Sequence, residues 1–250
     1  MKGIYAAIIF CFLIMTEGMA IASDKYDYPI KGGTAKWETL LTHNDMIEAT
    51  QIPWSVIDKM STEGLVETCL SYPLLGDINA YDSVQLGYDA VASRFNGLIA
   101  LASRKDAASI LLKKYKEMDP DAIGQDWDLL NKGLFVNAFN NVEILLSQYT
   151  ILAKLTQEER DELVEQTSIK SQGKLRQVDV FGFTGQERTK IIAGRILQKI
   201  GSPEFSKKVS QKNSLRDYLA YGLTAERDPF DDIDLEVDHY LSNMEKGGHK

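Results

Sequence analysis

The sequence predicts an all-α fold, arranged as an irregular multi-helix bundle. Apolar residues recur every three or four positions along most of residues 42–221, which is the period of a helix with one buried face. Residue types typical of helix ends separate these stretches. The composition is that of a folded globular protein, with 44% hydrophobic and 26% charged residues. Stacked helical pairs are an open alternative, although the sequence has no fixed-period repeat.

The N-terminus predicts a secretion signal over residues 1–22. Lys2 precedes the apolar run Ile4–Met15, and a small-x-small sequence ending at Ala22 is typical of a cleavage site. The run is shorter than the roughly 20 apolar residues that a membrane-spanning helix requires. We therefore expect cleavage near Ala22, export to the periplasm, the cell surface or the medium, and no transmembrane segment in the mature chain.

The mature chain has a single cysteine, Cys69, because Cys11 lies in the predicted leader. A single thiol cannot form an internal disulfide. The mature chain also lacks an Asn-x-Ser/Thr glycosylation site. Both absences favour a bacterial exported protein over a small secreted animal domain. Cys69 falls on the apolar stripe of a predicted helix, so we expect it to pack in the core.

The charge balance makes nucleic acid an unfavourable partner. The formal net charge is -8 and the pI is about 5.0, so the surface repels phosphate backbones. The short basic groups, Lys113–Lys114 and Lys207–Lys208, are each diluted by their neighbours. Such pairs are typical of solvated helix faces.

Residues 23–41 predict an extended arm ahead of a helical domain over residues 42–221. Pro29 favours extended backbone at Tyr28, and Gly32–Gly33 interrupts regular structure. We expect the aromatic side chains of the arm to anchor it on the helical body. A ligand-binding aromatic patch is the alternative.

In the first half of the helical domain, capping residues predict two helix starts. Thr42 followed by Asp45 forms a variant capping box, and the Ser61–Thr62 pair caps a later helix. The apolar stripe over residues 84–102 predicts one continuous or slightly kinked helix, and the stripe over residues 107–118 predicts another.

Residues 126–155 are the longest apolar stretch after the leader and predict a helix inside the bundle. Apolar residues fall on two faces at helical spacing, one marked by Trp127 and Leu134 and the other by Phe135 and Phe139. A helix that is apolar on two sides is expected to be buried on two sides. Burial of one such Leu or Phe contributes about 1.5–3 kcal/mol, so we expect this helix to dominate stability.

In the second half, Thr156 followed by Glu159 forms a capping box for a more polar helix that fades by Gly173. Residues 174–183 alternate weakly, which predicts at most one short strand or an extended connector. Another capping box at Thr184 then predicts the start of a further helix.

The C-terminal part contains clear stop and start signals. Gly201 and Pro203 predict a helix end and a restart, and residues 215–221 predict one more short helix. Residues 222–250 form an acidic C-terminal segment with a frayed tail. Its interleaved acidic and apolar residues suggest a strand or helix with one side in solvent, and a weak calcium site is the alternative.

No residue pattern predicts catalysis, a metal centre or a cofactor. His43, His239 and His249 are scattered along the chain, which has no Gly-x-Ser-x-Gly nucleophile elbow. One Cys and dispersed His residues do not make a structural zinc site, and the chain lacks a phosphate-binding glycine loop. We therefore predict no catalytic residues, no metal ligands and no cofactor.

Four polar residues within an apolar region are weak candidates for ligand contact: Arg94, Asn96, Arg104 and Asp106. The competing interpretation is that these side chains tie helix ends together, as polar side chains commonly do through local hydrogen bonds.

Several residue strings occur in order along the first half of the chain: Tyr28-Pro29-Ile30, Gly33-Thr34 with Trp37, Met60-Ser61-Thr62, Leu65-Val66-Glu67-Thr68-Cys69, Tyr72-Pro73-Leu74, Arg94-Phe95-Asn96-Gly97 and Arg104-Lys105-Asp106. These strings resemble a family of exported bacterial helical proteins with no established activity, over about half of the chain. Gly32 stands where that family is expected to carry Pro. The resemblance implies an exported helical domain and supplies no catalytic residues.

These observations favour a non-enzymatic binding or interaction module that works at the cell surface or in the periplasm, with a protein or envelope component as partner. The alternatives are a hydrolase with an unrecognised site and a structural spacer. An enzyme requires a large cleft lined by converging polar groups, including Asp, Arg or His. A binding module requires an exposed apolar or aromatic patch instead, and a spacer requires neither.

Overall fold

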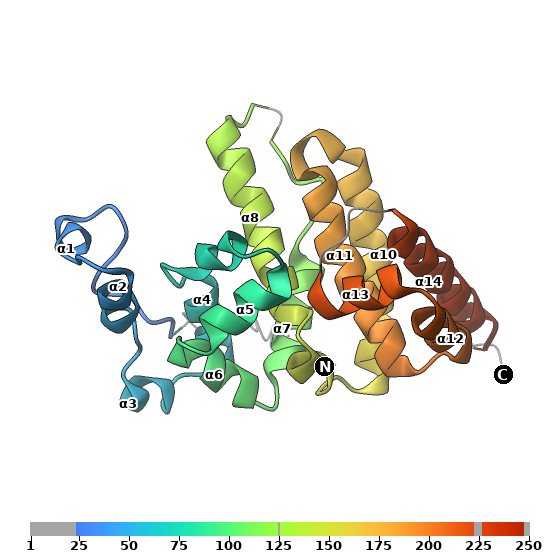
Figure 1. Cartoon of the computed structure of the whole chain (residues 1–250), viewed down its shortest axis with the longest axis horizontal. Helices are drawn as coiled ribbons and strands as arrows, with labels where there is room; N and C mark the ends of the chain where they lie inside the picture. The colour runs from blue at the N-terminus through green and yellow to red at the C-terminus, as the bar shows by residue number, and fades with distance from the viewer. Residues whose placement is uncertain (1–23, 125, 223–226, 248–250) are drawn as a thin grey trace, which may run out of the picture.

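The computed structural model describes residues 24–124, 126–222 and 227–247, and every regular element within these ranges is helical (Figure 1). The predicted all-α fold class is therefore confirmed. The elements are α1 (Ala35–Glu38), α2 (His43–Ala49), α3 (Trp54–Ile57), α4 (Thr62–Leu70), the 3-10 helix η1 (Leu75–Ala80), α5 (Val84–Ala92), α6 (Asn96–Ser103), α7 (Ala107–Glu117), α8 (Leu129–Leu146), α9 (Tyr149–Leu152), α10 (Gln157–Arg176), α11 (Val178–Ile200), α12 (Pro203–Gln211), α13 (Asn213–Tyr221) and α14 (Asp228–Gly247).

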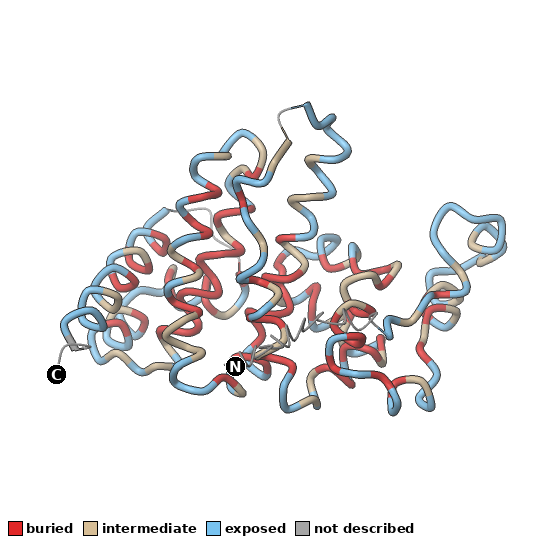
Figure 2. Tube along the Cα trace, turned by 180° about the vertical axis from the view of Figure 1, so that it is seen from behind, coloured by how far each residue is buried: buried red, intermediate tan, exposed pale blue. Residues whose placement is uncertain are grey.

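The helices form an elongated body, with α1–α3 at one end and α12 and α14 at the other (Figure 1). α10 and α11 form the most extensively packed pair, α8 contacts α7 and α11, and α4 contacts α6 and α7. α14 packs against α10, α11 and α13. Buried residues concentrate where α7, α8, α10 and α11 meet, whereas the loop around α1 is exposed (Figure 2).

Most of the predicted helix ends are present because they depend on neighbouring residues alone. Thr42 and Thr156 both form complete capping boxes with the residues three positions later, and the Ser61 hydroxyl accepts a hydrogen bond from the Gly64 backbone N–H at 3.0 Å. Gly201 ends α11 with a left-handed φ of 84°. Pro203 begins α12.

The N-terminal arm is anchored on α4. The Asp24 carboxylate accepts hydrogen bonds from the Ser61 backbone N–H and the Ser61 hydroxyl, both at 2.6 Å. The Tyr26 backbone N–H donates to Thr68 Oγ1 at 2.9 Å. Tyr28 is buried, and its ring lies 6.1 Å from that of Tyr72. The aromatic side chains therefore hold the arm by burial.

Residues 174–183 contain no strand, which the prediction of at most one short strand allows, but the alternative of an extended connector is wrong. Residues 174–176 end α10, and α11 already begins at Val178, before the predicted start at Thr184. Gly182 then interrupts α11 with φ 60° and ψ -166°, a backbone conformation that is essentially restricted to glycine. The weak alternation in the sequence reflects this interrupted helix.

The single helix predicted over residues 84–102 is two helices, α5 and α6, so that prediction is also wrong. The break occurs because Asn96 uses its side chain on a distant segment. Its Oδ1 accepts from the Ile52 backbone N–H at 3.1 Å, and its Nδ2 donates to the Ile52 carbonyl at 2.6 Å. The Asn96 backbone N–H donates to Gln51 Oε1. These bonds fix the start of α6.

The helix predicted to lie inside the bundle is buried over only half its length. In α8, the C-terminal half carries the buried Phe139, Val142 and Leu145, but Leu129 and Leu134 near its start are 89% and 59% exposed. The N-terminal half rises above α4–α7, beside the turn between α10 and α11 (Figure 1). The two-faced apolar pattern correctly identifies a helix. In its first turns, however, Phe135 contacts Phe181 of α11, whereas Leu129 and Leu134 on the other face are exposed.

A fully buried arginine joins two helix ends. Arg195 on α11 donates to the Ser147 carbonyl at 3.0 Å and to the Leu219 and Ala220 carbonyls at 2.8 and 3.1 Å. These carbonyls lie at the C-terminal ends of α8 and α13, where partial negative charge accumulates. The ring of Tyr149 also lies 4.7 Å from the guanidinium carbon. The helix ends thus supply the countercharge for a buried cation.

Candidate functional site

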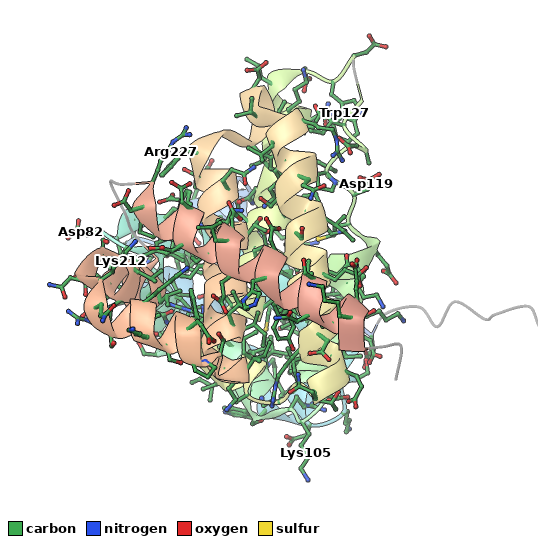
Figure 3. All side chains as sticks on the ribbon, turned by 90° about the vertical axis from the view of Figure 1, so that its right-hand side faces the viewer. Asp82, Lys105, Asp119, Trp127, Lys212 and Arg227 are labelled. Atoms are coloured by element: carbon green, nitrogen blue, oxygen red, sulfur yellow. The ribbon has the colours of Figure 1, made fainter. Side chains whose placement is uncertain are left out.

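A groove runs between α10, α11 and α14, on the side of the molecule shown in Figure 3, where α14 lies across the other two helices. It consists of two adjoining hollows, which we call the apolar chamber and the polar chamber, and together the α14 groove. The two chambers have volumes of about 200 and 240 Å³ and share the side chains of Leu175, Lys190 and Asp234. Two other hollows, of about 430 and 360 Å³, are more open to solvent.

The apolar chamber is walled by aliphatic and aromatic side chains that remain largely exposed. Leu175, Val178 and Phe183 are 57%, 51% and 44% exposed, although they surround a hollow rather than a convex surface. The Phe183 ring stacks on Phe230 of α14, with centroids 5.1 Å apart and planes 24° apart. The Gly182 break in α11 directly precedes Phe183, so a backbone conformation available to glycine sets the position of this wall.

The polar chamber lies further along α14 and is lined by hydroxyl, amide and carboxylate groups. They come from Thr167, Ser168, Ser171 and Gln172 of α10 and from Asp238 of α14. The Ser171 hydroxyl donates to Gln186 Oε1 at 3.2 Å, and Gln186 Nε2 donates back to the Ser171 carbonyl at 3.3 Å. This reciprocal pair fixes the floor of the groove between α10 and α11.

An ion pair divides the two chambers. Lys190 of α11 is almost fully buried, and its ammonium contacts the carboxylate of Asp234 on α14. Because Lys190 lies on α11 and Asp234 on α14, the pair also ties α14 to the body. Lys190 is therefore already neutralised and does not offer a free cation to a ligand.

Neither a scan against protein-family models nor searches of curated proteins and of solved structures find a match for this chain. The resemblance of the N-terminal strings to an exported bacterial family stays a prediction.

The four polar residues predicted as weak contact candidates all bond within the chain, and they do not converge on one hollow. Arg94 donates to Asn44 Oδ1, and Asn96 is bonded to Ile52 as described above. Arg104 donates to the Ile57 carbonyl at 2.7 Å, and Asp106 accepts from the Thr62 hydroxyl at 2.7 Å. These contacts link α2–α4 to α5–α7, as the competing interpretation expects.

A His, an Asp and an Arg side chain meet in a small hollow beside α2, η1 and α5. His43 Nε2 lies 3.2 Å from an Asp77 carboxylate oxygen, and Arg94 and Tyr72 line the same hollow. The volume of this hollow is only about 20 Å³. That is close to the space one water molecule requires, so a substrate has no room beside the imidazole.

A second polar cluster is sealed inside the core. Lys174 Nζ donates to Glu143 Oε2 at 2.6 Å and to Thr189 Oγ1 and the Gly185 carbonyl, both at 2.9 Å. Tyr115 and Thr189 donate to Glu143 Oε1 at 2.9 and 2.7 Å. Burial lowers the pKa of Lys174, and the adjacent Glu143 carboxylate opposes that shift. Because neither charged side chain has exposed surface, the cluster is inaccessible to a ligand.

Within residues 24–124, 126–222 and 227–247, no group of three or more His, Cys, Asp or Glu side chains is placed to hold a metal ion. In the acidic C-terminal segment, Asp232 pairs with Lys212 at 2.5 Å and Asp234 pairs with Lys190.

The described helices also include none that is both long and apolar enough to cross a bilayer. Cys69 is fully buried, as expected, and burial raises the pKa of its thiol.

None of the four predicted contact candidates lines the groove, whereas the acidic segment considered as a weak calcium site contributes Asp231, Asp234 and Asp238 to it. Two signals in the sequence bear on the groove. Gly182 before Phe183 marks a backbone break next to an aromatic residue, and Asp231, Asp234 and Asp238 recur at the spacing of one helix face. Neither signal reveals which surface α14 covers, because that depends on packing between segments distant in sequence.

Proposed function

We propose that this protein is an exported, non-enzymatic binding module that holds part of its partner in the α14 groove. The observation that carries the proposal is the exposed apolar wall of Leu175, Val178 and Phe183 around a hollow. Exposed apolar surface in a concave setting is typical of ligand and protein contact sites.

The lining of the groove favours binding over hydrolysis. Among the residues that the structure describes, no His or Cys lines either chamber, Ser171 is bonded to Gln186, and Lys190 is paired with Asp234. An activated nucleophile requires a base within hydrogen-bond distance, and this set of residues does not supply one. A structural spacer, in turn, has no use for a partly apolar hollow.

The location outside the cytoplasm rests on the leader predicted over residues 1–22, which lies outside the described residues. The proposed partner is a protein or another envelope component. Expression of the full chain in a bacterium, followed by mass spectrometry of the cell envelope and medium, tests this part. A mature N-terminus near Ser23 is expected, and an intact Met1 in a cytoplasmic product contradicts it.

Binding of the neutral fluorescent probe Nile red tests the groove itself. We expect saturable binding to the wild-type protein that Val178→Asp weakens about tenfold, equivalent to roughly 1.4 kcal/mol. Phe183→Ala provides a second variant without added charge. Leu235→Asp is the matched control, because Leu235 is 63% exposed on α14 and does not line the groove. Equal binding by all four proteins excludes the groove as the apolar site.

A further inference from the structure

The α14 groove carries an uncompensated negative charge at its polar end. Asp231, Asp234 and Asp238 project along the groove side of α14, and among the described residues only Asp234 is paired there, with Lys190. Asp238 is exposed, and none of the ion pairs among the described residues includes it. The α10 residues opposite, Thr167, Ser168, Ser171 and Gln172, are neutral.

The opposite end of the groove has different chemistry. Its walls are Leu175, Val178, Phe183 and Phe230, and the nearby charges, Arg227 and Asp231, have opposite signs. Figure 3 shows Arg227 at the end of the molecule where α14 begins. An apolar group is therefore favoured in the apolar chamber, and a cation is favoured beside Asp238.

The spacing between the two ends selects the size of the ligand. Phe230 and Asp238 lie eight positions apart on α14, which is about 12 Å along a helix that rises 1.5 Å per residue. An extended peptide spans that distance with three or four residues, at about 3.3 Å per residue. Ser168 and Gln172 line the polar chamber on its α10 side and can bond to peptide amides, which an alkyl chain lacks.

We infer that the α14 groove takes an extended peptide segment of a partner protein, with an apolar side chain in the apolar chamber and a Lys or Arg beside Asp238, three or four residues along. This inference rests on the proposed function and specifies the ligand of that same site. Charge complementarity then supplies selectivity, and the apolar contact supplies most of the affinity.

Four blocked pentapeptides test the inference by fluorescence anisotropy or calorimetry at low salt. The parent peptide is Phe-Ala-Ala-Ala-Lys, and the others replace Lys by Glu, Lys by norleucine, or Phe by Ala. We expect the parent to bind most tightly and the Glu peptide about two- to fivefold more weakly than the norleucine peptide, as for one exposed charge pair. The preference for Lys is expected to fade as salt is added.

A charge reversal on the protein identifies the contact. In Asp238→Lys the order of the Lys and Glu peptides is expected to reverse, whereas Asp217→Lys, a reversal at an exposed position on α13 outside the groove, leaves the order unchanged. Asp238 makes no described ion pair and is exposed, so the variant is expected to fold.

The possible outcomes separate this inference from the proposed function. If the peptides do not bind, or if Asp238→Lys fails to reverse their order, the inference is overturned, and Nile red binding still decides on the groove. If octylamine binds as tightly as the parent peptide and with the same dependence on Asp238, the peptide assignment is overturned. If Nile red binding does not depend on Val178 and Phe183, both proposals fail.

Discussion

Lys174 and Glu143 place two opposite charges inside the protein, with no exposed surface on either side chain. All three ammonium protons of Lys174 have acceptors, on α8 and α11. Removing two charges from water costs several kcal/mol each, which their attraction repays only with complete hydrogen bonding. Because the groups are satisfied only when α8, α10 and α11 meet in this arrangement, the pair constrains how these three helices pack.

Removing one member of this pair is expected to cost more than removing both. Lys174→Met leaves a buried, unpaired carboxylate and should lower the free energy of unfolding by about 3–5 kcal/mol. Adding Glu143→Gln removes that charge while keeping an acceptor for Tyr115 and Thr189, so the double variant should be more stable than Lys174→Met alone. Urea unfolding of Lys174→Met, Glu143→Gln and the double variant provides the measurement. Additive losses contradict the expected coupling.

At the scale of a single element, α8 has two halves with different environments. Its C-terminal half is enclosed by α7 and α11, and its N-terminal half projects into solvent with Leu129, Leu130 and Leu134 exposed. On the inner side of this half, Phe135 contacts Trp127 and Phe139, with ring centroids 5.5 and 5.3 Å apart. The contribution of a leucine to stability therefore depends on its position along the helix.

A matched pair of truncations in α8 tests this difference. Leu145→Ala removes a fully buried side chain and should cost about 2–5 kcal/mol of unfolding free energy. Leu134→Ala removes a side chain that is 59% exposed and should change stability by no more than about 0.5 kcal/mol. Thermal or urea unfolding compares them directly. A large loss in Leu134→Ala indicates that another surface covers this part of α8 in solution.

The interruption of α11 depends on Gly182. Its positive φ with ψ near -166° is costly for any residue with a Cβ, so Gly182→Ala should destabilise the protein by about 1–3 kcal/mol. Gly133→Ala is the control, since Gly133 is helical, exposed and has no atom near its Cβ position. It should stabilise by about 0.5–1 kcal/mol. The same sign for both variants, measured by urea unfolding, contradicts this account.

At the scale of the whole molecule, burial of phenol groups predicts loss of stability at alkaline pH. Burial raises the pKa of Tyr88, Tyr115 and Tyr218 above the ordinary value of 10.0. The folded state then retains protons that the unfolded state releases above pH 10.0, so stability is unaffected below that pH and falls above it. The lowered pKa of Lys174 has the opposite effect, because it makes stability rise with pH. That effect is confined to pH values below 10.5, the ordinary pKa of lysine.

Above pH 10.0 the free energy of unfolding is expected to fall by about 1.4 kcal/mol per pH unit for each buried tyrosine. Urea unfolding between about pH 9 and pH 11.5 measures it, and phenolate absorbance should appear together with unfolding. Tyr88→Phe should reduce the slope by one tyrosine, since no hydrogen bond of the Tyr88 hydroxyl is found within the described ranges. Ionisation of these groups in the folded protein contradicts the prediction.

Local chemistry made much of this fold predictable. The capping boxes at Thr42 and Thr156 and the stop at Gly201 involve residues within one turn of each other, so neighbours in sequence decide them. The position of Cys69 in the core follows from the period of its helix. The fold class required no more than this periodicity.

The features that the sequence did not predict share a different cause. Periodicity shows which residues of α8 lie on one face, but it does not show whether another helix covers Leu134. The break between α5 and α6 depends on Ile52, which lies far from Asn96 in sequence. The groove depends on α14 crossing α10 and α11, which brings Phe230 to Phe183. Each of these features is set by contacts between distant segments.

Arg195 shows how strongly such contacts couple the molecule. Its single guanidinium bonds to the last turns of both α8 and α13. In sequence, these turns are separated by more residues than α10 and α11 contain together. Fraying of either end would leave a cation without enough acceptors in a place that water does not reach. The two ends are therefore expected to open together, and a chain shortened before α13 would leave Arg195 without two of the three carbonyls that accept its hydrogen bonds.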